Sequence, residues 1–124
     1  MKTAVSTHKA PAAIGPYSQA IAYGNLFYTS GQMGMDPATG KLCEGLEAQT
    51  RMALENLKAV LTEAGSDFSK VLKSLVFITD MANFATVNSI YEEYFPAPFP
   101  ARSCVAVAEL PKGALVEIEV VAAL

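Results

Sequence analysis

The sequence is poor in the side chains on which many catalytic and binding sites depend. Its 124 residues include one histidine, two cysteines and no tryptophan. Cys43 and Cys104 stand far apart and form no CxxC pair, so neither a disulfide framework nor a zinc ribbon is supported. The lone histidine, His8, has no partner nearby in sequence. We therefore expect a protein without a bound metal or other cofactor.

Long apolar runs are also missing. No stretch approaches the roughly 18 consecutive apolar residues of a membrane helix. The first residues, Met1 to Lys9, contain no apolar segment typical of a signal peptide. We expect a cytoplasmic protein with no membrane partner.

Charge is scarce, and positive charge is scarcer still. Charged residues make up 17% of the chain and the net charge is −3. Only Arg51 and Arg102 are arginines. Proteins that bind nucleic acids take most of their affinity from lysine and arginine contacts with phosphates. A nucleic-acid partner is therefore not expected.

What the chain does have is apolar surface, because 52% of its residues are hydrophobic. A small domain has much surface for its volume, and large exposed apolar patches usually mark interfaces. The composition therefore predicts a homo-oligomer in which one face of each subunit is buried against another.

Periodicity predicts a single domain, residues 1–124, with the order β-β-α-β-α-β-β. Gly24-Asn25 separates two short strand-forming runs and predicts a hairpin. Apolar spacing over 47–64 predicts a helix that ends at Gly65, and a second helix starts near Asp80 or Asn83. The expected strands are 20–23, 26–30, 71–79, 103–110 and 115–122, and the expected helices are 47–64 and 83–95. The strand 71–79 carries apolar residues at both odd and even positions, which predicts burial on both of its faces. Two helices cover only one face of such a sheet, so the second face calls for another subunit.

Two kinds of charged residue are candidates for chemistry. Arg102 follows a proline-rich connector and opens a strand, a place suited to bidentate recognition of a carboxylate. A surface arginine in a salt bridge is the alternative. Glu117 and Glu119 share one face of an apolar strand, so each needs a cation or water if that face is covered. Arg102 is a candidate cation for one of them, and an edge strand exposed to solvent is the alternative.

Four further positions give weaker signals. Asn88 lies three residues before Tyr91 and touches the apolar stripe of the second helix, to which Tyr91 belongs, and a structural amide is the simpler interpretation. Ser30 and Gly31 end a strand with small residues, which either allows a ligand to approach or forms a turn. Tyr17 follows a rigid Gly-Pro turn and either packs or lines a site. Cys104 has no nearby base, which favours a small apolar role over a nucleophile.

Taken together, several segments closely resemble the RidA (YjgF) family of reactive-intermediate deaminases. The match runs essentially end to end, and the runs A-P-A-A-I-G-P-Y and P-A-R-S-C-V are its most specific parts. The segments are 10–19, 29–32, 84–88, 100–105, 110–112 and 116–119. The resemblance implies an α+β, chorismate-mutase-like fold, with two helices on one face of the sheet. It also implies a homotrimer with a central barrel-like core and a cleft at each subunit boundary.

The resemblance further implies hydrolysis of 2-imino acids, such as 2-iminobutanoate and 2-iminopropanoate, to 2-keto acids and ammonia. These reactive imines damage pyridoxal-phosphate enzymes. By resemblance, Arg102 binds the substrate carboxylate and Glu117 positions water. The remaining cleft residues would be Tyr17, Ser30, Gly31, Asn88 and Cys104. The connector from Phe95 to Phe99 is shorter than in some members, which bears on the range of substrates.

Two other functions stay open on the sequence. The same cleft would serve a regulatory module that binds a small carboxylate without turning it over, because function resides in the site and not in the fold. Relatives have also been described as ribonucleases or translation inhibitors. The acidic net charge of this chain weighs against binding to RNA.

Overall fold

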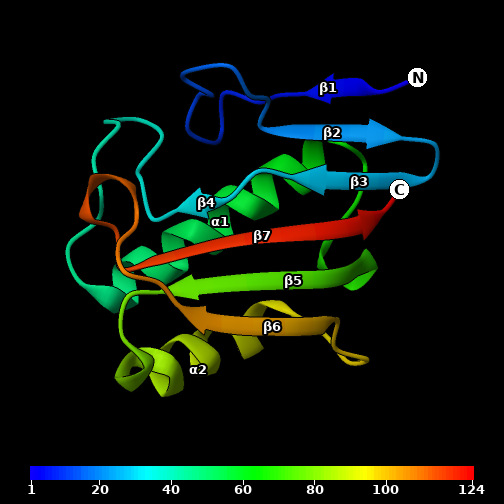
Figure 1. The fold of residues 1–124 in the computed structure, drawn as a ribbon. Coiled ribbons are helices and arrows are strands. Elements are labelled where there is room, and N and C mark those ends of the chain that lie inside the picture. Colours follow the sequence, from blue (N-terminus) through cyan, green and yellow to red (C-terminus); the bar gives the residue numbers. More distant parts are fainter.

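A mixed β-sheet and two helices on one of its faces form the two layers of the molecule (Figure 1). The computed structural model describes residues 1–124. The seven-stranded sheet has the order β1-β2-β3-β7-β5-β6, and β4 pairs with β7 beside β3. The strands are β1 Thr3–Val5, β2 Ala20–Tyr23, β3 Leu26–Thr29, β4 Gln32–Met33, β5 Val71–Ile78, β6 Ala101–Ala106 and β7 Val116–Ala123, and the helices are α1 Leu46–Glu63 and α2 Phe84–Tyr94. The predicted α+β fold with both helices on one face is confirmed.

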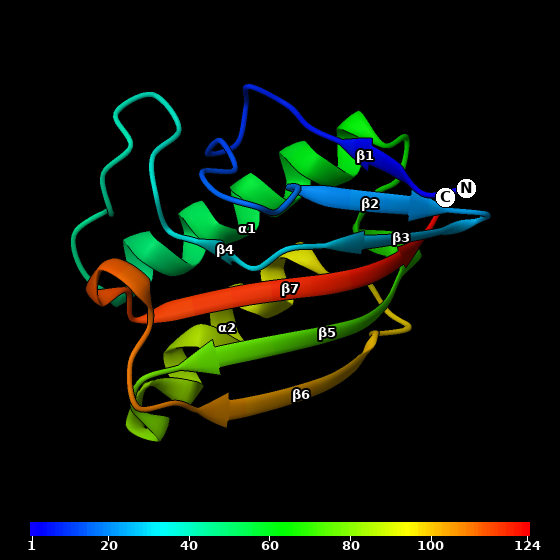
Figure 2. The ribbon, with the colours of Figure 1, turned by 45° about the horizontal axis from the view of Figure 1, so that its top comes forward.

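The two longest strands, β5 and β7, lie in the middle of the sheet, and the shorter strands β1 and β6 form its edges. β7 lies between β3 and β5 and is antiparallel to both, whereas β5 and β6 are parallel. A parallel pair needs a crossover, which α2 supplies. Figure 2 shows β1 at one edge and β6, beside α2, at the other.

Local sequence signals account for the ends of several elements. Gly24 has a φ of +61°, as the tight β2–β3 hairpin requires, and Tyr23 pairs with Leu26 across it. Gly65 has a φ of +81° just beyond α1, and Ser66 N–H donates to the carbonyl of Leu61. The hairpin and the end of the first helix are therefore confirmed.

The second helix was predicted to be capped by Asp80 or Asn83, and the structure differs slightly from both predictions. The Asp80 carboxylate accepts a hydrogen bond from Ala82 N–H at 2.9 Å, and thereby caps a short 3-10 turn over Met81–Asn83. That turn leads directly into α2, and the Asn83 side chain makes no capping bond. Asp80 is therefore the cap, acting one turn before the α-helix proper.

Three strand predictions need correction. β6 covers Ala101–Ala106 and not 103–110, because its partner β5 ends at Ile78, which pairs with Ala106. The strands β1 and β4 were not predicted, since runs of three and two residues carry no readable alternation.

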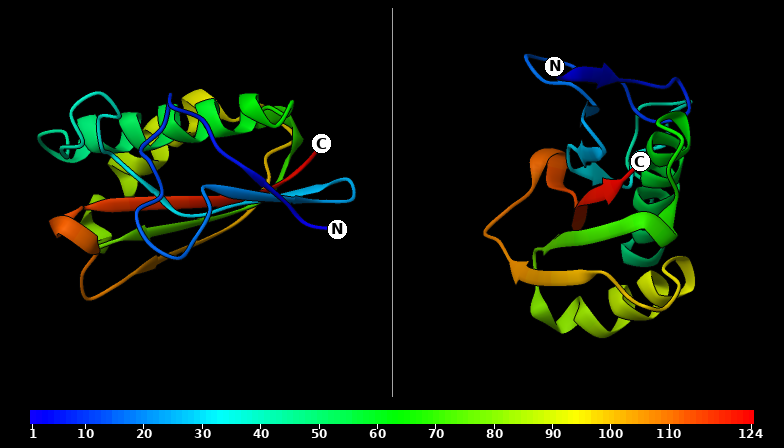
Figure 3. Two further views of the ribbon diagram at one scale, coloured as in Figure 1. Left: turned by 90° about the horizontal axis from the view of Figure 1, so that it is seen from above. Right: turned by 90° about the vertical axis from the view of Figure 1, so that its right-hand side faces the viewer.

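The core lies between the sheet and the helices, and the other face of the sheet is uncovered (Figure 3). Phe27, Leu57 and Ile118 are fully buried on the helix side. On the opposite side Tyr28 is 47% exposed and Val105 43% exposed. The prediction that β5 is buried on both faces therefore fails within one chain, because Leu75 and Phe77 are only half-buried. Neither helix combines the length and apolar character that crossing a bilayer requires.

Candidate active site

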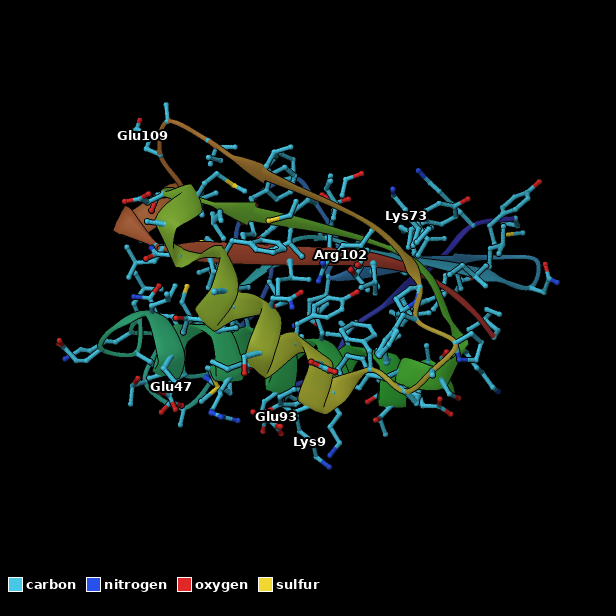
Figure 4. All side chains as sticks on the ribbon, turned by 90° about the horizontal axis from the view of Figure 1, so that it is seen from below. Lys9, Glu47, Lys73, Glu93, Arg102 and Glu109 are labelled. Atoms are coloured by element: carbon cyan, nitrogen blue, oxygen red, sulfur yellow. The ribbon has the colours of Figure 1, made fainter.

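Arg102 lies on the helix-covered side of the edge strand β6. It pairs in register with Ser74 of β5, whose neighbour on β7 is the buried Val120. Residues paired across a sheet project to the same face, so the arginine points toward α2. Figure 4 shows Arg102 where β6 faces that helix.

Three side chains of α2 surround the guanidinium of Arg102. Its Nη1 donates a hydrogen bond of 2.7 Å to Asn88 Oδ1. The guanidinium carbon lies 4.8 Å from the ring centre of Tyr91 and 5.4 Å from that of Phe84. We call Arg102, Asn88, Tyr91 and Phe84 the arginine half-site. An open cavity of about 350 Å³ lies beside it, also lined by Glu92, Phe99 and Pro100.

No carboxylate of the same chain neutralises Arg102. The ion pairs of the protein belong to Arg51, which contacts Glu47 at 3.6 Å and Glu93 at 3.0 Å. The alternative that Arg102 forms a surface salt bridge is therefore not met within one chain. The remaining guanidinium N–H groups of Arg102 make no hydrogen bond within the protein. They are available to an anionic ligand with two oxygens.

Glu117 lies on the opposite face of the sheet. It pairs with Phe77 of β5 and Met33 of β4, three residues along β5 from the partner of Arg102. An odd number of residues along a strand separates opposite faces, so the two charged side chains point away from each other. One chain therefore does not bring Arg102 and Glu117 together, and Arg102 pairs with neither Glu117 nor Glu119.

The carboxylate of Glu117 opens into a cavity of about 480 Å³. Tyr17, Ser30 and Gly31 line this cavity too. We call these three residues and Glu117 the glutamate half-site. No protein group donates a hydrogen bond to the carboxylate, and partial burial, followed by the nearby negative charge of Glu119, raises the pKa of Glu117. A carboxylate in that condition is suited to accept a proton from water.

Because Gly31 has no side chain, the side chain of Glu117 has room beside it. A Cβ atom at position 31 would lie 2.6 Å from Cδ of Glu117 and 2.8 Å from its Cγ. Any side chain at position 31 would therefore displace the carboxylate. The group that approaches Gly31 closely is thus the side chain of Glu117, and the approach of a ligand at this position stays a prediction.

Ser30 is held by hydrogen bonds to two backbone carbonyl groups. Its hydroxyl donates to the carbonyl of Ser18 at 2.6 Å, and its N–H donates to the carbonyl of Gln19 at 2.9 Å. These bonds join the end of β3 to the segment that carries Tyr17. Ser30 thus shapes the glutamate half-site, with its hydroxyl proton already engaged.

Gln19 was not singled out in the sequence, although it organises the same segment. Its buried side-chain amide donates to the carbonyls of Pro11 at 2.7 Å and Thr7 at 3.1 Å. Its Oε1 accepts from Thr7 N–H at 2.7 Å. The loop before β2 is thereby tied down, which places Tyr17 at the cavity. A glutamine inside a loop of small residues was the available signal.

Cys104 lies two residues beyond Arg102 and packs half-buried against the core. Burial raises the pKa of the Cys104 thiol, and the lowering effect of Arg102 is the smaller contribution. A nucleophilic thiol needs the opposite shift. The structure therefore favours a packing role for this side chain. No group of three or more histidine, cysteine or carboxylate side chains gathers in a way that would hold a metal ion.

Comparison with known proteins settles the family. A family model described as Endoribonuclease L-PSP matches residues 7–124. The chain is 48% identical to the 2-iminobutanoate/2-iminopropanoate deaminase of Salmonella typhimurium, over 98% of each chain. The chain belongs to the RidA (YjgF) family. Its similarity to the deaminase of Bos taurus is 50% identity, over 95% of this chain and 87% of the relative.

Solved structures agree with this assignment of the fold. A protein of Thermotoga maritima, described as a putative endoribonuclease, superposes with a TM-score of 0.97 at 50% identity, and the match covers 100% of this chain and 98% of that one. The fold of the RidA family, expected from the resemblance, is therefore confirmed.

Proposed function

We propose that this protein hydrolyses reactive 2-imino acids, such as 2-iminobutanoate and 2-iminopropanoate, to 2-keto acids and ammonia. The same activity is part of the names of the relatives from Salmonella typhimurium and Bos taurus. Within the chain, one observation carries the proposal. A cation with free donors and a carboxylate without a donor lie on opposite faces of the protomer.

Arg102 supplies the anchor for the substrate. A 2-imino acid carries one carboxylate, and a guanidinium binds it through two parallel N–H groups. Asn88 holds Nη1 from the other side, which limits rotation of the guanidinium. The anchor fixes the position of the adjacent C=N carbon, and positioning of this kind lowers the barrier by several kcal/mol.

Glu117 acts on water. The oxygen of a water molecule adds to the imine carbon as its proton passes to the Glu117 carboxylate. The C=N double bond becomes a single bond as the nitrogen takes this proton back from Glu117, which leaves a carbinolamine. Glu117 then accepts the proton of the new hydroxyl group, so that the C=O bond forms, and passes it to the nitrogen as the C–N bond breaks and ammonia leaves. Tyr17 closes the cavity, and backbone groups near Gly31 and Cys104 bind the imine nitrogen or the water.

The separation of the half-sites supports a cyclic assembly. A substrate that contacts Arg102 and Glu117 needs them from two protomers, so the site lies at a subunit interface. A head-to-tail ring repeats this contact in every cleft. The uncovered sheet face, with Tyr28 and Val105 exposed, is the apolar surface that the ring would bury. We propose the homotrimer with a central barrel-like core that the family resemblance implies, and its location in the cytoplasm stays a prediction.

A coupled assay tests the activity. A threonine dehydratase generates 2-iminobutanoate, and release of the keto acid is timed with and without this protein. We expect faster release with the wild type and the uncatalysed rate with Arg102→Ala, while the oligomer remains intact. An unchanged rate with the wild type would contradict the proposal, and full activity of Arg102→Ala would contradict the anchoring role.

A mixing experiment tests the shared site. Arg102→Ala and Glu117→Gln subunits are each inactive, and they are refolded together in equal amounts. A cleft is active when one subunit provides Arg102 and its neighbour Glu117, each with a chance of one half. About a quarter of the wild-type activity is therefore expected in the mixture. A mixture that stays inactive would place both residues in one protomer's site.

A binding module is the second candidate. One RidA-family structure, that of E. coli TdcF, is described with bound serine and is 41% identical with a TM-score of 0.92. A small amino acid in a relative favours a cleft for small carboxylates. The coupled assay separates this candidate from the enzyme, because a binding module leaves the rate of keto-acid release unchanged. The net charge of −3 disfavours nucleic acid as the ligand.

A further inference from the structure

The ring of Tyr91 forms a floor beneath the guanidinium of Arg102. The guanidinium carbon is 4.8 Å from the ring centre, inside the roughly 6 Å range of a cation–π contact. The ring of Phe84 is more distant, at 5.4 Å. Tyr91 is therefore the nearer of two aromatic contacts, and it has no role in the chemistry proposed for Arg102 and Glu117.

Tyr91 is itself fixed at two points. Its ring stacks on Phe95, with centroids 4.1 Å apart and planes 19° apart. Its hydroxyl forms a hydrogen bond of 2.6 Å with the hydroxyl of Ser74. Ser74 is fully buried, and Tyr91 is only 4% exposed. A buried ring held at its face and at its tip has little freedom to move.

The anchor at Ser74 is linked to the strand that carries the arginine. Ser74 is the β5 residue that pairs in register with Arg102 of β6. The tyrosine hydroxyl therefore binds the sheet beside the same point from which the arginine side chain leaves. This places the ring at a fixed height below the guanidinium.

Arg102 needs such a support because little else holds it. No carboxylate of the chain pairs with it, and its guanidinium makes one hydrogen bond, to Asn88. An arginine loses much side-chain entropy when it is immobilised for binding. A single hydrogen bond still allows the guanidinium plane to swing about that contact. The ring removes this freedom before a ligand arrives.

We propose that Tyr91, anchored by Ser74, is a positioning residue that holds the guanidinium of Arg102 in the plane required for carboxylate binding. This inference rests on the proposed function in one respect, namely that Arg102 binds the substrate carboxylate. It differs from a mere core role, in which Tyr91 fills space and the order of Arg102 does not depend on it.

The order of the guanidinium is measured first, without any substrate. The chain has only two arginines, so nitrogen NMR signals of their side chains are easily assigned. We expect slow guanidinium rotation at Arg102 in the wild type and fast rotation in Tyr91→Leu. Arg51, held by Glu93 at 3.0 and 3.1 Å, is the internal control and should not change.

Tyr94→Leu is the matched control on the same helix. Tyr94 packs edge-on against the ring of Phe68, and the aromatic rings that contact Arg102 are those of Phe84 and Tyr91. Its replacement removes a similar aromatic side chain from α2. We expect it to lower thermal stability and to leave the Arg102 signal as in the wild type. Equal loss of Arg102 order in both variants would overturn the proposal.

Carboxylate binding is measured next, with 2-oxobutanoate as the stable probe. Loss of the ring should weaken the affinity of Tyr91→Leu by about tenfold, within the usual range of a partly desolvated cation–π contact. In the coupled assay KM should rise while kcat changes by less than about twofold, because the ring touches no reacting atom. Tyr91→Phe keeps the ring and should bind within about threefold of the wild type.

A shape-conserving variant decides the matter if Tyr91→Leu fails to fold. A trifluorinated phenylalanine at position 91 keeps the size of phenylalanine and weakens the negative face of the ring. We expect faster guanidinium rotation and weaker 2-oxobutanoate binding than in Tyr91→Phe. Identical signals in the two variants would overturn the role of the ring face.

The two proposals fail in different ways. A wild type that does not accelerate imine hydrolysis contradicts the proposed function, and the arginine signals still decide the role of Tyr91. A folded Tyr91→Leu with wild-type Arg102 rotation and wild-type affinity contradicts the positioning role, and leaves the activity of the wild type untouched.

Discussion

The two half-sites treat their charged groups in opposite ways. In the arginine half-site, Arg102 has a hydrogen-bond acceptor in Asn88 and two aromatic rings against it. In the glutamate half-site, Glu117 has no hydrogen-bond donor and lies near the like charge of Glu119. The cation is held firmly, and the carboxylate is left without partners.

This difference matches the tasks that we propose for them. A group that binds a substrate benefits from a fixed orientation, because less entropy is lost on binding. A group that takes a proton from water benefits from a raised pKa, which brings it closer to the operating pH. In the mechanism that we propose, the lack of partners around Glu117 serves its role as the base, and each half of the contrast can be tested.

The largest effect is expected from Glu117→Gln. The amide keeps the shape of the side chain and cannot accept the proton, so the rate of imine hydrolysis should fall by about a thousandfold. The coupled assay measures this rate, and equilibrium binding of 2-oxobutanoate should change little because the arginine half-site is intact. A rate within tenfold of the wild type would assign the proton to another group.

Gly31→Ala should disturb the same carboxylate without a change in its chemistry. The new Cβ would overlap Glu117 Cδ, and because only the end of a side chain stands in the way, the side chain moves and the fold survives. We expect a loss of about a hundredfold in rate, comparable with a misplaced catalytic group. Retention of full activity would show that Glu117 tolerates displacement.

Gly34→Ala is the contrasting control for that substitution. A Cβ at position 34 would meet backbone atoms of Gln49 in α1, which do not swing aside as a side chain does. We expect a marked loss of thermal stability from Gly34→Ala and little from Gly31→Ala, measured by thermal unfolding. The pair thus separates damage to the site from damage to the fold.

Asn88→Ala tests the arginine half-site and should have a smaller effect. It removes the one hydrogen bond that the guanidinium makes, while both rings remain. A hydrogen bond to a charged group contributes about 1.5–3 kcal/mol, and the rings retain part of the order, so KM should rise by about tenfold. Asn83→Ala is the control, because its side chain makes no capping bond. Equal KM values for Asn88→Ala and the wild type would contradict the role of Asn88.

Glu119→Gln should produce the smallest change, which appears in the pH profile. Partial burial is the main cause of the raised pKa of Glu117, and the charge of Glu119 adds to it, so removal of that charge lowers the pKa. The carboxylate form of Glu117 is the active one, and activity therefore rises with pH through this pKa. We expect the acid side of the profile to move to lower pH in Glu119→Gln with the same plateau. A shift in the opposite direction would contradict the assignment of Glu117 as the base.

Much of the fold was readable in the sequence, because local chemistry controls it. The apolar stripe of Ala53, Leu57, Val60 and Leu61 predicted the first helix to within a residue at each end. Gly24 and Gly65 marked a hairpin and a helix end through backbone angles that glycine adopts most easily. By contrast, β6 was misplaced, because an edge strand ends where its partner ends and its own residues do not record that point.

The candidate residues could be named from sequence segments, but their arrangement could not. Tyr17, Ser30, Gly31 and Glu117 come from three distant parts of the chain and line one cavity, while Asn88 and Arg102 line another. Tyr91 was predicted only as part of an apolar stripe. Its contact with Arg102 depends on how α2 lies across the sheet.

By itself the sequence determined the family, the order of the main elements and the types of side chain available for chemistry. Those properties follow from local backbone preferences, apolar periodicity and a set of specific segments. Only the tertiary structure decided that Arg102 and Glu117 face opposite ways. Alternation along a strand tells which of its own residues share a face, whereas the register of β6 and β7 with β5 decides which residues of different strands share one.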